Sequence, residues 1–116
     1  MKEFNKQKGV IQEEIASKFV VKNKRLKILE QNYRTRLGEI DIIAMDRDKT
    51  IVFVEVKYRK TGKFGLGREA VDDRKIAKIR NVATQFLIQK GWQDNKVRFD
   101  VIDILDDKIT YIDNAF

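Results

Sequence analysis

Two carboxylates lie in segments that are otherwise apolar, and a lysine follows one of them two residues later. Asp41 is flanked by isoleucines, and Glu55 lies within the apolar run over residues 51–56, with Lys57 just beyond it. A buried carboxylate without a partner or a cation is strongly destabilising. The residues therefore indicate either a cation site or a simple Glu–Lys ion pair at the ends of strands, where side chains are exposed to solvent.

These three side chains suit phosphodiester hydrolysis. Hard oxygen ligands such as Asp41 and Glu55 suit Mg²⁺ or Mn²⁺, which can polarise a phosphoryl oxygen and lower the pKa of a bound water. Lys57 shares a strand face with Glu55, so it can position the water or offset the charge that develops on phosphate. The chain has no His and no Cys, which excludes Ser-His-Asp and Cys-His nucleophiles and zinc sites of the His/Cys type.

Apolar periodicity predicts the elements that must position these side chains. Helical spacing predicts an amphipathic helix over residues 9–20, with Ile11, Ile15, Ala16 and Phe19 on its apolar face. A second helix is expected over residues 70–87, ending near Gly91. Strands are predicted over residues 26–33, 40–45, 50–58, 97–105 and 109–112.

The same pattern predicts the fold class. The strand over residues 50–58 is apolar on both faces for most of its length, which indicates a central position in the sheet. A mobile loop is expected over the glycine-rich residues 60–67. We predict a single α/β domain over residues 1–116, with a central mixed β-sheet flanked by helices in the order α-β-β-β-α-β-β.

Asp41 and Glu55 can share one ion only if they lie opposite each other on adjacent antiparallel strands. A three-residue turn over residues 47–49 gives that register, with Met45 opposite Ile51. A two-residue turn would set Asp41 opposite Val54 and send its carboxylate to the other face of the sheet. The three-residue turn is therefore the geometric prediction that the metal site requires.

The net charge of +7 is unevenly distributed over the 116 residues. Residues 1–36 hold 10 basic and 4 acidic side chains, and residues 57–81 hold 9 and 3, while the segments that follow each of them are net acidic. Basic surfaces attract polyanions through phosphate contacts, although solubility alone can also explain such clusters. No charged-then-apolar leader opens the chain and its longest apolar runs span four residues, so we expect a soluble, cytoplasmic protein with no membrane partner.

The spacing of Asp41, Glu55 and Lys57 resembles the PD-(D/E)xK nuclease motif, in which a carboxylate precedes a Glu-x-Lys triplet. More closely, the chain is similar to the YraN-like family of small bacterial proteins, which resemble archaeal Holliday-junction resolvases. Seven segments carry this likeness: Glu13-x-x-Ala16, Asn32-x-Arg34, Gly38-Glu39-Ile40-Asp41, Val54-Glu55-Val56-Lys57-x-Arg59, Lys75, Arg98-Phe99-Asp100-Val101 and Asn114-Ala115-Phe116.

The resemblance implies a restriction-endonuclease-like fold and a site in the first helix and two strands. The implied catalytic residues are Asp41, Glu55, Lys57 and Glu13, with Val56 as a third metal ligand beside Asp41 and Glu55. Position 12 is Gln where the family has its usual Gly-Glu pair, and both Glu13 and Glu14 follow it. Only one of the two can face the site, since they lie about 100° apart on a helix, and the spacing to Ala16 favours Glu13.

Nucleic acid is the expected partner. The candidate binding residues are Arg34, Arg59, Lys63, Lys75 and Lys78, although lysines on a solvated helix face are common without such a role. The leading hypothesis is an endonuclease for structured or branched DNA that depends on Mg²⁺ or Mn²⁺, and its resolvase-like relatives imply a homodimer. The alternative is a catalytically silent nucleic-acid-binding module of the same fold that serves DNA repair or uptake. A basic protein with a non-nucleic partner is the third hypothesis.

Overall fold

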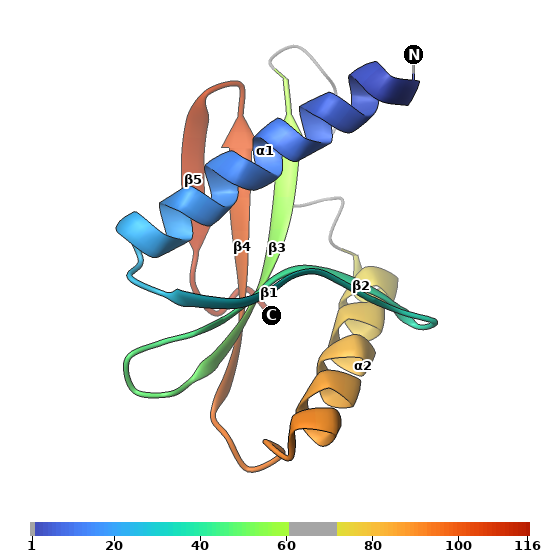
Figure 1. Ribbon diagram of the computed structural model, residues 1–116, viewed down its shortest axis with the longest axis vertical. Coiled ribbons are helices and arrows are strands. Elements are labelled where there is room, and N and C mark those ends of the chain that lie inside the picture. Colours follow the sequence, from blue (N-terminus) through green and yellow to red (C-terminus); the bar gives the residue numbers. More distant parts are fainter. Residues whose placement is uncertain (1, 61–71) are drawn as a thin grey trace.

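The protein is an α/β structure in which five strands form one mixed sheet and two helices cover its opposite faces (Figure 1). The computed structural model describes residues 2–60 and 72–116, with side chains described for residues 11–60 and 72–116. The helices are α1 (Lys2–Lys22) and α2 (Asp73–Lys90). The strands are β1 (Lys27–Thr35), β2 (Gly38–Met45), β3 (Ile51–Arg59), β4 (Val97–Leu105) and β5 (Lys108–Ile112).

Strand order in the sheet follows the chain, from β1 at one edge to β5 at the other. Every neighbouring pair is antiparallel except β3 and β4, which are parallel because α2 lies between them in the chain. The predicted fold class and element order are confirmed. Most of the loop predicted over residues 60–67, and residues 70 and 71 of the expected second helix, lie outside the described residues.

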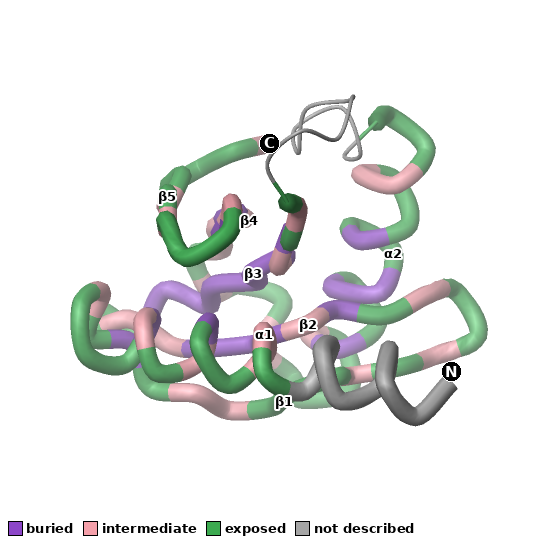
Figure 2. The backbone as a smooth tube through the Cα atoms, turned by 90° about the horizontal axis from the view of Figure 1, so that it is seen from above, coloured by how far each residue is buried: buried purple, intermediate pink, exposed green. Residues whose placement is uncertain are grey.

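β3 is the central strand of the core, as its sequence predicts. Its residues alternate between two apolar clusters, with Val52 and Val54 on the α1 side and Ile51 and Phe53 on the α2 side. The burial colouring shows β3 as a buried strand between the two helices (Figure 2). Two charged residues further along β3, Glu55 and Lys57, are buried as well, which is unusual for charged side chains.

Helix α1 is longer than the predicted span of residues 9–20, and part of its predicted apolar face is wrong. Ala16 and Val20 are fully buried and Phe19 packs beside them, but Ile11 and Ile15 are exposed by 52% and 37%. The sheet therefore accepts only a narrow stripe of the helix. Helical periodicity identifies an apolar stripe but not how much of it a neighbouring sheet covers.

Helix α2 ends near Gly91 as predicted, but it begins at Asp73 rather than at the predicted residue 70, because Asp72 is extended and caps its N-terminus. The Asp72 carboxylate accepts a hydrogen bond from the Lys75 N–H (2.9 Å) at the N-terminus. Gly91 adopts φ 73° at the C-terminus, a left-handed conformation that glycine takes without strain. Within the described residues, neither α1 nor α2 is long and apolar enough to cross a membrane.

The hairpin between β2 and β3 has the register that the metal site requires. Met45 pairs with Ile51, and the Asp46 N–H donates to the Thr50 carbonyl (2.9 Å), so residues 47–49 form the turn. Lys49 has φ 69°, the left-handed residue expected at the end of a three-residue hairpin turn. The predicted register is confirmed from Met45 and Ile51 to Ile42 and Val54, the last paired positions before Asp41 and Glu55.

A buried polar cluster joins β4 to the C-terminal residues. Asp100 on β4 is fully buried and accepts hydrogen bonds from the Arg98 guanidinium, the Tyr111 hydroxyl and the Asn114 N–H. Arg98 also pairs with Asp46 beside the β2–β3 turn (3.2 Å). The Asp100 carboxylate therefore connects β4 with β5 and with the residues that follow β5.

Candidate active site

β2 and β3 separate at the point where Asp41 occurs. Their pairing ends at Ile42 and Val54, and in the next position the Asp41 carboxylate accepts a hydrogen bond from the Val56 N–H (2.8 Å). Ile40 and Ile43 both pack in the cluster on the α2 side, so strict side-chain alternation is interrupted between them. This interruption lets Asp41 bond across to the neighbouring strand.

Gly38 sets the path of β2 just before this point. It has φ 146°, and a Cβ there would lie 3.5 Å from the Val82 Cγ2 and 3.8 Å from the Lys78 Cβ of α2. A positive φ of this kind is strained for any residue with a side chain. Glycine thus supplies the backbone conformation at the start of β2, beside α2 and three residues before Asp41.

The pKa of Asp41 is raised to about 7. Burial is the main cause, and the neighbouring Glu55 carboxylate is the second; the hydrogen bond from Val56 acts in the opposite direction. The negative charges of Glu39 and Glu13 raise it further. Asp41 is thus a carboxylate that burial and neighbouring negative charges both destabilise in its ionised form, which is the electrostatic condition that a bound cation relieves.

Glu55 is nearly buried and touches two lysines. Its Oε1 lies 3.0 Å from the Lys75 Nζ and 3.5 Å from the Lys57 Nζ. The Glu55 and Lys57 side chains are 8% and 9% exposed, whereas that of Lys75 is 40% exposed. The simple Glu–Lys pair that the sequence allows is present, but α2 supplies a second cation that spacing along β3 does not reveal.

The two lysines differ in their pKa shifts. Burial lowers the pKa of Lys57, and the adjacent Lys75 lowers it further, against the attraction of Glu55. Burial also acts to lower the pKa of Lys75, but hydrogen bonds to Lys57 and Glu55 and the charges of Glu55 and Asp41 outweigh it, so this pKa is raised. Lys57 is therefore the lysine that gives up a proton more readily.

Glu13, rather than Glu14, is oriented towards the site. The Asn32 side chain on β1 donates to the Glu13 Oε2 (3.1 Å), and the Glu13 charge acts on Asp41. Glu14 instead lines a shallow apolar groove with Ser17 and other residues of α1. The sequence assigned no site role to Asn32, although an Asn within a strand pattern is one of the few residues that tolerates its left-handed φ of 54°.

The donor set fits a magnesium-like ion held by two carboxylates. Mg²⁺ in proteins usually binds one or two carboxylates and keeps several waters, and Asp41 and Glu55 supply those carboxylates. Val56 has no side-chain donor, so only its backbone carbonyl could serve as a ligand. Among the side chains of residues 11–60 and 72–116, no group of three or more Asp or Glu gathers in a metal-binding arrangement, so Glu13 as a further ligand stays a prediction.

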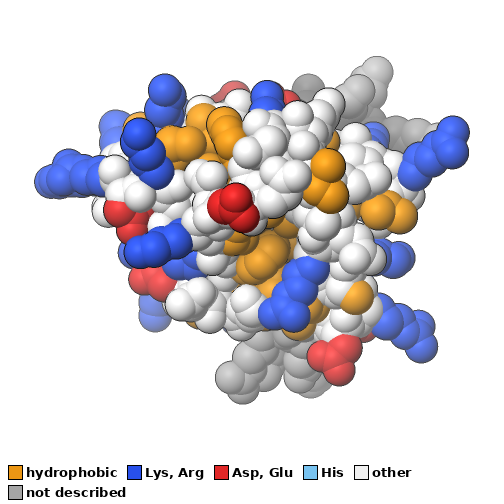
Figure 3. Space-filling model, turned by 90° about the horizontal axis from the view of Figure 1, so that it is seen from below, with side chains coloured by type: hydrophobic (Ala, Val, Ile, Leu, Met, Phe, Trp, Pro, Cys, Tyr) orange, Lys and Arg blue, Asp and Glu red, His pale blue; other side chains and the backbone are white. Residues whose placement is uncertain are grey.

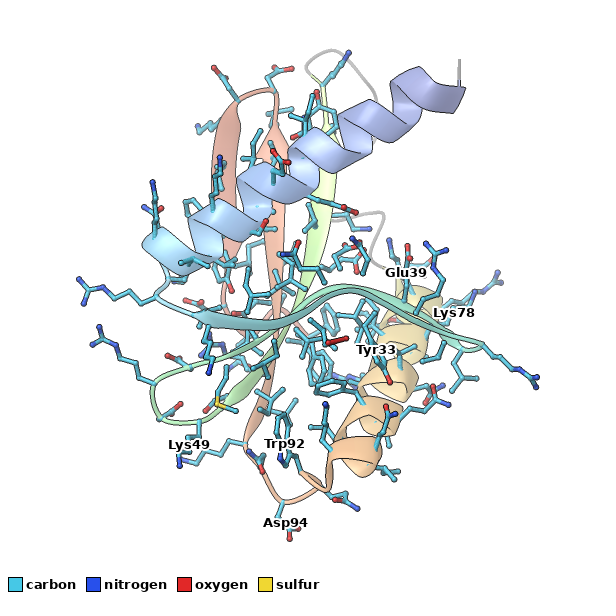
Figure 4. All side chains as sticks on the ribbon, viewed as in Figure 1. Tyr33, Glu39, Lys49, Lys78, Trp92 and Asp94 are labelled. Atoms are coloured by element: carbon cyan, nitrogen blue, oxygen red, sulfur yellow. The ribbon has the colours of Figure 1, made fainter. Side chains whose placement is uncertain are left out.

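The predicted nucleic-acid-binding residues lie in different environments. Arg34 pairs with Glu39 (2.9 Å) and Arg59 pairs with Asp103 (3.2 Å), so both are engaged within the chain. Lys78 is exposed on α2, at the end where β2 passes the helix (Figure 4). Lys63 lies outside the described residues. Lys75 contacts Glu55, so it belongs to the candidate site itself.

Basic side chains are also found away from the site. The end of the molecule seen in Figure 3 has hydrophobic patches in its middle and many Lys and Arg side chains around its margin, with few acidic ones. On this face the basic side chains lie mostly around the margin and do not gather into one compact patch. Long-range attraction of polyanions needs no single basic face.

The raised pKa of Asp41 predicts that the folded protein loses stability as pH rises. Its pKa is 3.8 in a model peptide and about 7 when folded, so the folded chain binds this proton more tightly. The free energy of unfolding should then fall between pH 4 and pH 7, by at most about 4 kcal/mol. Thermal unfolding at intervals from pH 4.5 to 8.5 measures this slope.

Asp41→Asn is the matched control for this pH dependence, because it still accepts the Val56 hydrogen bond but cannot titrate. The chain has no His, so few other groups change charge between pH 5 and 8. The variant should lose much of the slope between pH 5 and 7. Equal slopes for both proteins would show that Asp41 does not titrate in this range.

Fold and site together define a class of small α/β proteins with a mixed sheet. In this class an Asp on one strand and a Glu-x-Lys triplet on the next lie where the two antiparallel strands separate. The chain belongs to the uncharacterised protein family UPF0102, whose model matches residues 12–104. The predicted YraN-like membership is confirmed.

Curated relatives agree with this assignment over most of their length. A UPF0102 protein of Fusobacterium nucleatum is 54% identical over 88 residues, which cover 76% of this chain and 73% of the relative. A UPF0102 protein of Alkaliphilus oremlandii is 49% identical and aligns over 97% of this chain and 99% of its own. Among solved structures, a repair endonuclease from Pyrococcus abyssi is similar with a TM-score of 0.49 and 20% identity, over 78% of this chain and 37% of that one.

Proposed function

We propose that this protein is a metal-dependent phosphodiesterase, an endonuclease that acts on structured or branched DNA. The observation that supports it best is the pairing of two carboxylates in an apolar sheet, Asp41 and Glu55, with Lys57 beside Glu55. A buried cluster of charges at the core of a small domain costs stability. A catalytic role in phosphodiester hydrolysis is the most direct reason for a protein to keep this charged cluster in an apolar sheet.

In this proposal Asp41 and Glu55 hold Mg²⁺ or Mn²⁺. The ion would polarise a phosphoryl oxygen, lower the pKa of a water and stabilise the leaving oxyanion. Asp41 is kept in place by the Val56 N–H, and Glu55 by its two lysines. Both carboxylates are therefore fixed before any ligand arrives, which reduces the cost of ordering them on binding.

Lys57 has the second role in the proposal. Its side chain is 9% exposed and it shares a strand face with Glu55, so its amine is fixed beside the carboxylates. Its lowered pKa brings it closer to neutral pH, where a lysine can accept a proton from the attacking water or donate a hydrogen bond to the phosphate. Glu13, held by Asn32, would adjust the charge around Asp41 from the α1 side.

Direct cleavage assays test this function. Four-way junction, duplex and single-stranded DNA would be incubated with the purified protein, with Mn²⁺ or Mg²⁺ and with EDTA. We expect strand cleavage that requires the metal and is fastest on branched DNA. Tight binding to DNA without cleavage of any substrate would instead support the silent binding module, and failure to bind or cleave would contradict both hypotheses.

Binding to DNA should weaken as salt rises. A log–log plot of affinity against salt has a slope of about −0.9 for each phosphate that a basic side chain neutralises. Lys78→Gln on α2 should make the slope less steep by roughly 0.9. The measurement is fluorescence anisotropy with labelled junction DNA at several salt concentrations, with Ca²⁺ in place of Mg²⁺.

Lys49→Asn is the matched control for Lys78, because Lys49 lies in the β2–β3 turn far from Lys78 (Figure 4) and Asn tolerates its left-handed φ. This variant should keep the wild-type slope. An affinity independent of salt would exclude phosphate contacts as the source of binding and favour a partner recognised through apolar surface.

A further inference from the structure

Glu55 contacts two lysine ammonium groups whose side chains differ in solvent exposure. Lys57 lies on the same strand, and its side chain is as buried as that of Glu55. Lys75 reaches Glu55 from the first turn of α2, and 40% of its side chain is exposed to solvent. Of the two ammonium groups, Lys75 makes the shorter contact, 3.0 Å against 3.5 Å, yet it is the one with open solvent beside it.

Lys75 also interacts with the second carboxylate of the site. The charge of Asp41 attracts it in addition to that of Glu55. The geometric observation is the contact with Glu55: the Lys75 Nζ lies 3.0 Å from the Glu55 Oε1, an oxygen that a divalent ion ligated by Glu55 would need. A divalent ion at Glu55 would add two positive charges beside the Lys57 and Lys75 ammonium groups, and charges of the same sign a few ångströms apart in a partly buried site repel strongly. The lysine with solvent beside it, Lys75, is the one that can move away.

We propose that Lys75 is a placeholder for the divalent cation: its ammonium neutralises Glu55 until a metal ion binds at Asp41 and Glu55, and binding displaces it into solvent. This inference rests on the proposed function and concerns the regulation of the same site. Lys57 stays in place because it has no open solvent to enter.

The placeholder has a functional consequence. A metal ion must compete with Lys75 for Glu55, so the affinity of the protein for metal alone is reduced. The displaced ammonium stands at the first turn of α2, beside the site, where it can contact a phosphate of the substrate. A polyanion that binds the displaced Lys75 would thereby favour metal loading, so the complete site would form only when metal and substrate are both present.

Metal binding without any substrate tests the proposal. Lys75→Met removes the charge and keeps the apolar length of the side chain, and Lys78→Met, one turn further along α2, is the matched control. Mn²⁺ binding would be followed by loss of the free-ion signal in electron paramagnetic resonance and by calorimetry. Lys75→Met should bind Mn²⁺ about tenfold more tightly than the wild type, which corresponds to about 1.4 kcal/mol, while Lys78→Met should match the wild type.

A second measurement uses the unaltered chain and so does not depend on the folding of a variant. Nuclear magnetic resonance of lysine ammonium groups would follow Lys75 during titration with Mg²⁺. Its signal should change to that of a freely hydrated lysine and broaden through exchange with water as the ion binds, and the signal of Lys57 should stay protected.

The outcomes separate this inference from the proposed function. Equal or weaker Mn²⁺ binding by Lys75→Met, or an unchanged Lys75 signal at saturating Mg²⁺, would overturn the placeholder and leave the metal site intact. Absence of Mn²⁺ binding by both the wild type and Lys75→Met would overturn the metal-dependent function and the placeholder with it. Lys75→Arg, which keeps the charge, should restore an affinity close to that of the wild type.

Discussion

Asp41→Asn should reduce metal-dependent DNA cleavage at least about 1,000-fold, a loss of about 4 kcal/mol of transition-state stabilisation. Asn has the volume of Asp and can still accept the hydrogen bond from the Val56 N–H, but it removes one of the two anionic metal ligands. Single-turnover cleavage of a labelled junction in Mn²⁺ measures the effect. Mn²⁺ affinity should fall in parallel.

The same substitution should leave the fold intact or make it more stable above neutral pH. At pH 8 the wild-type Asp41 is ionised next to Glu55 in a partly buried position, an arrangement that burial and repulsion disfavour. Asn removes that repulsion. Asp94→Asn, at an exposed position that points away from the rest of the chain (Figure 4), should change neither activity nor stability. Wild-type cleavage by Asp41→Asn would show that the assigned site is wrong.

Asp100→Ala should cause the largest loss of stability of any substitution considered, about 3–5 kcal/mol. Among the described residues, the change leaves the partly buried charge of Arg98 with Asp46 as its one carboxylate partner. It also removes the acceptor for the Tyr111 hydroxyl and the Asn114 N–H. For a domain of this size the midpoint of thermal unfolding should fall by about 10 °C or more. Circular dichroism during heating measures it.

Two comparisons make the Asp100 result specific. Asp94→Ala, exposed in the turn before β4, should shift the midpoint by no more than a degree or two, since its carboxylate is solvated. Asp100→Asn keeps the shape and some of the acceptors, so its loss should be intermediate. If Asp100→Ala unfolded at the wild-type temperature, the cluster would not contribute to stability as its geometry indicates.

The order and positions of the elements could be predicted from the sequence because the signals are local. β-Branched residues, the Gly91 cap and the three-residue turn each act within a few positions, and local rules predict them well. The Asp72 cap is also a local signal, but it was overlooked, and the second helix was expected two to three residues too early. The register followed from one further requirement, that Asp41 and Glu55 face the same ion. That requirement was chemical, and the hairpin has the required register up to Ile42 and Val54, one position before Asp41 and Glu55.

Contacts between distant segments were not predictable in the same way. Nothing in the spacing of residues 55 and 75 indicates that Lys75 reaches Glu55, because the crossing of α2 over the sheet decides it. The exposure of Ile11 and Ile15 is a related case, since it depends on how α1 crosses the sheet. The roles of Asp41, Glu55, Lys57 and Glu13 in catalysis stay predictions, which the variants above test.

The parallel pairing of β3 with β4 affects how the chain reaches this structure during synthesis. β2 and β3 are joined by a three-residue turn, whereas Ile51 cannot pair with Val97 until all of α2 has been made. Local hairpins close quickly and long-range pairing closes slowly. A nascent chain therefore holds β3 for a time as an uncovered, strongly apolar edge strand, the kind of surface that pairs with other chains. This interval, rather than the finished protein, is the stage most exposed to aggregation.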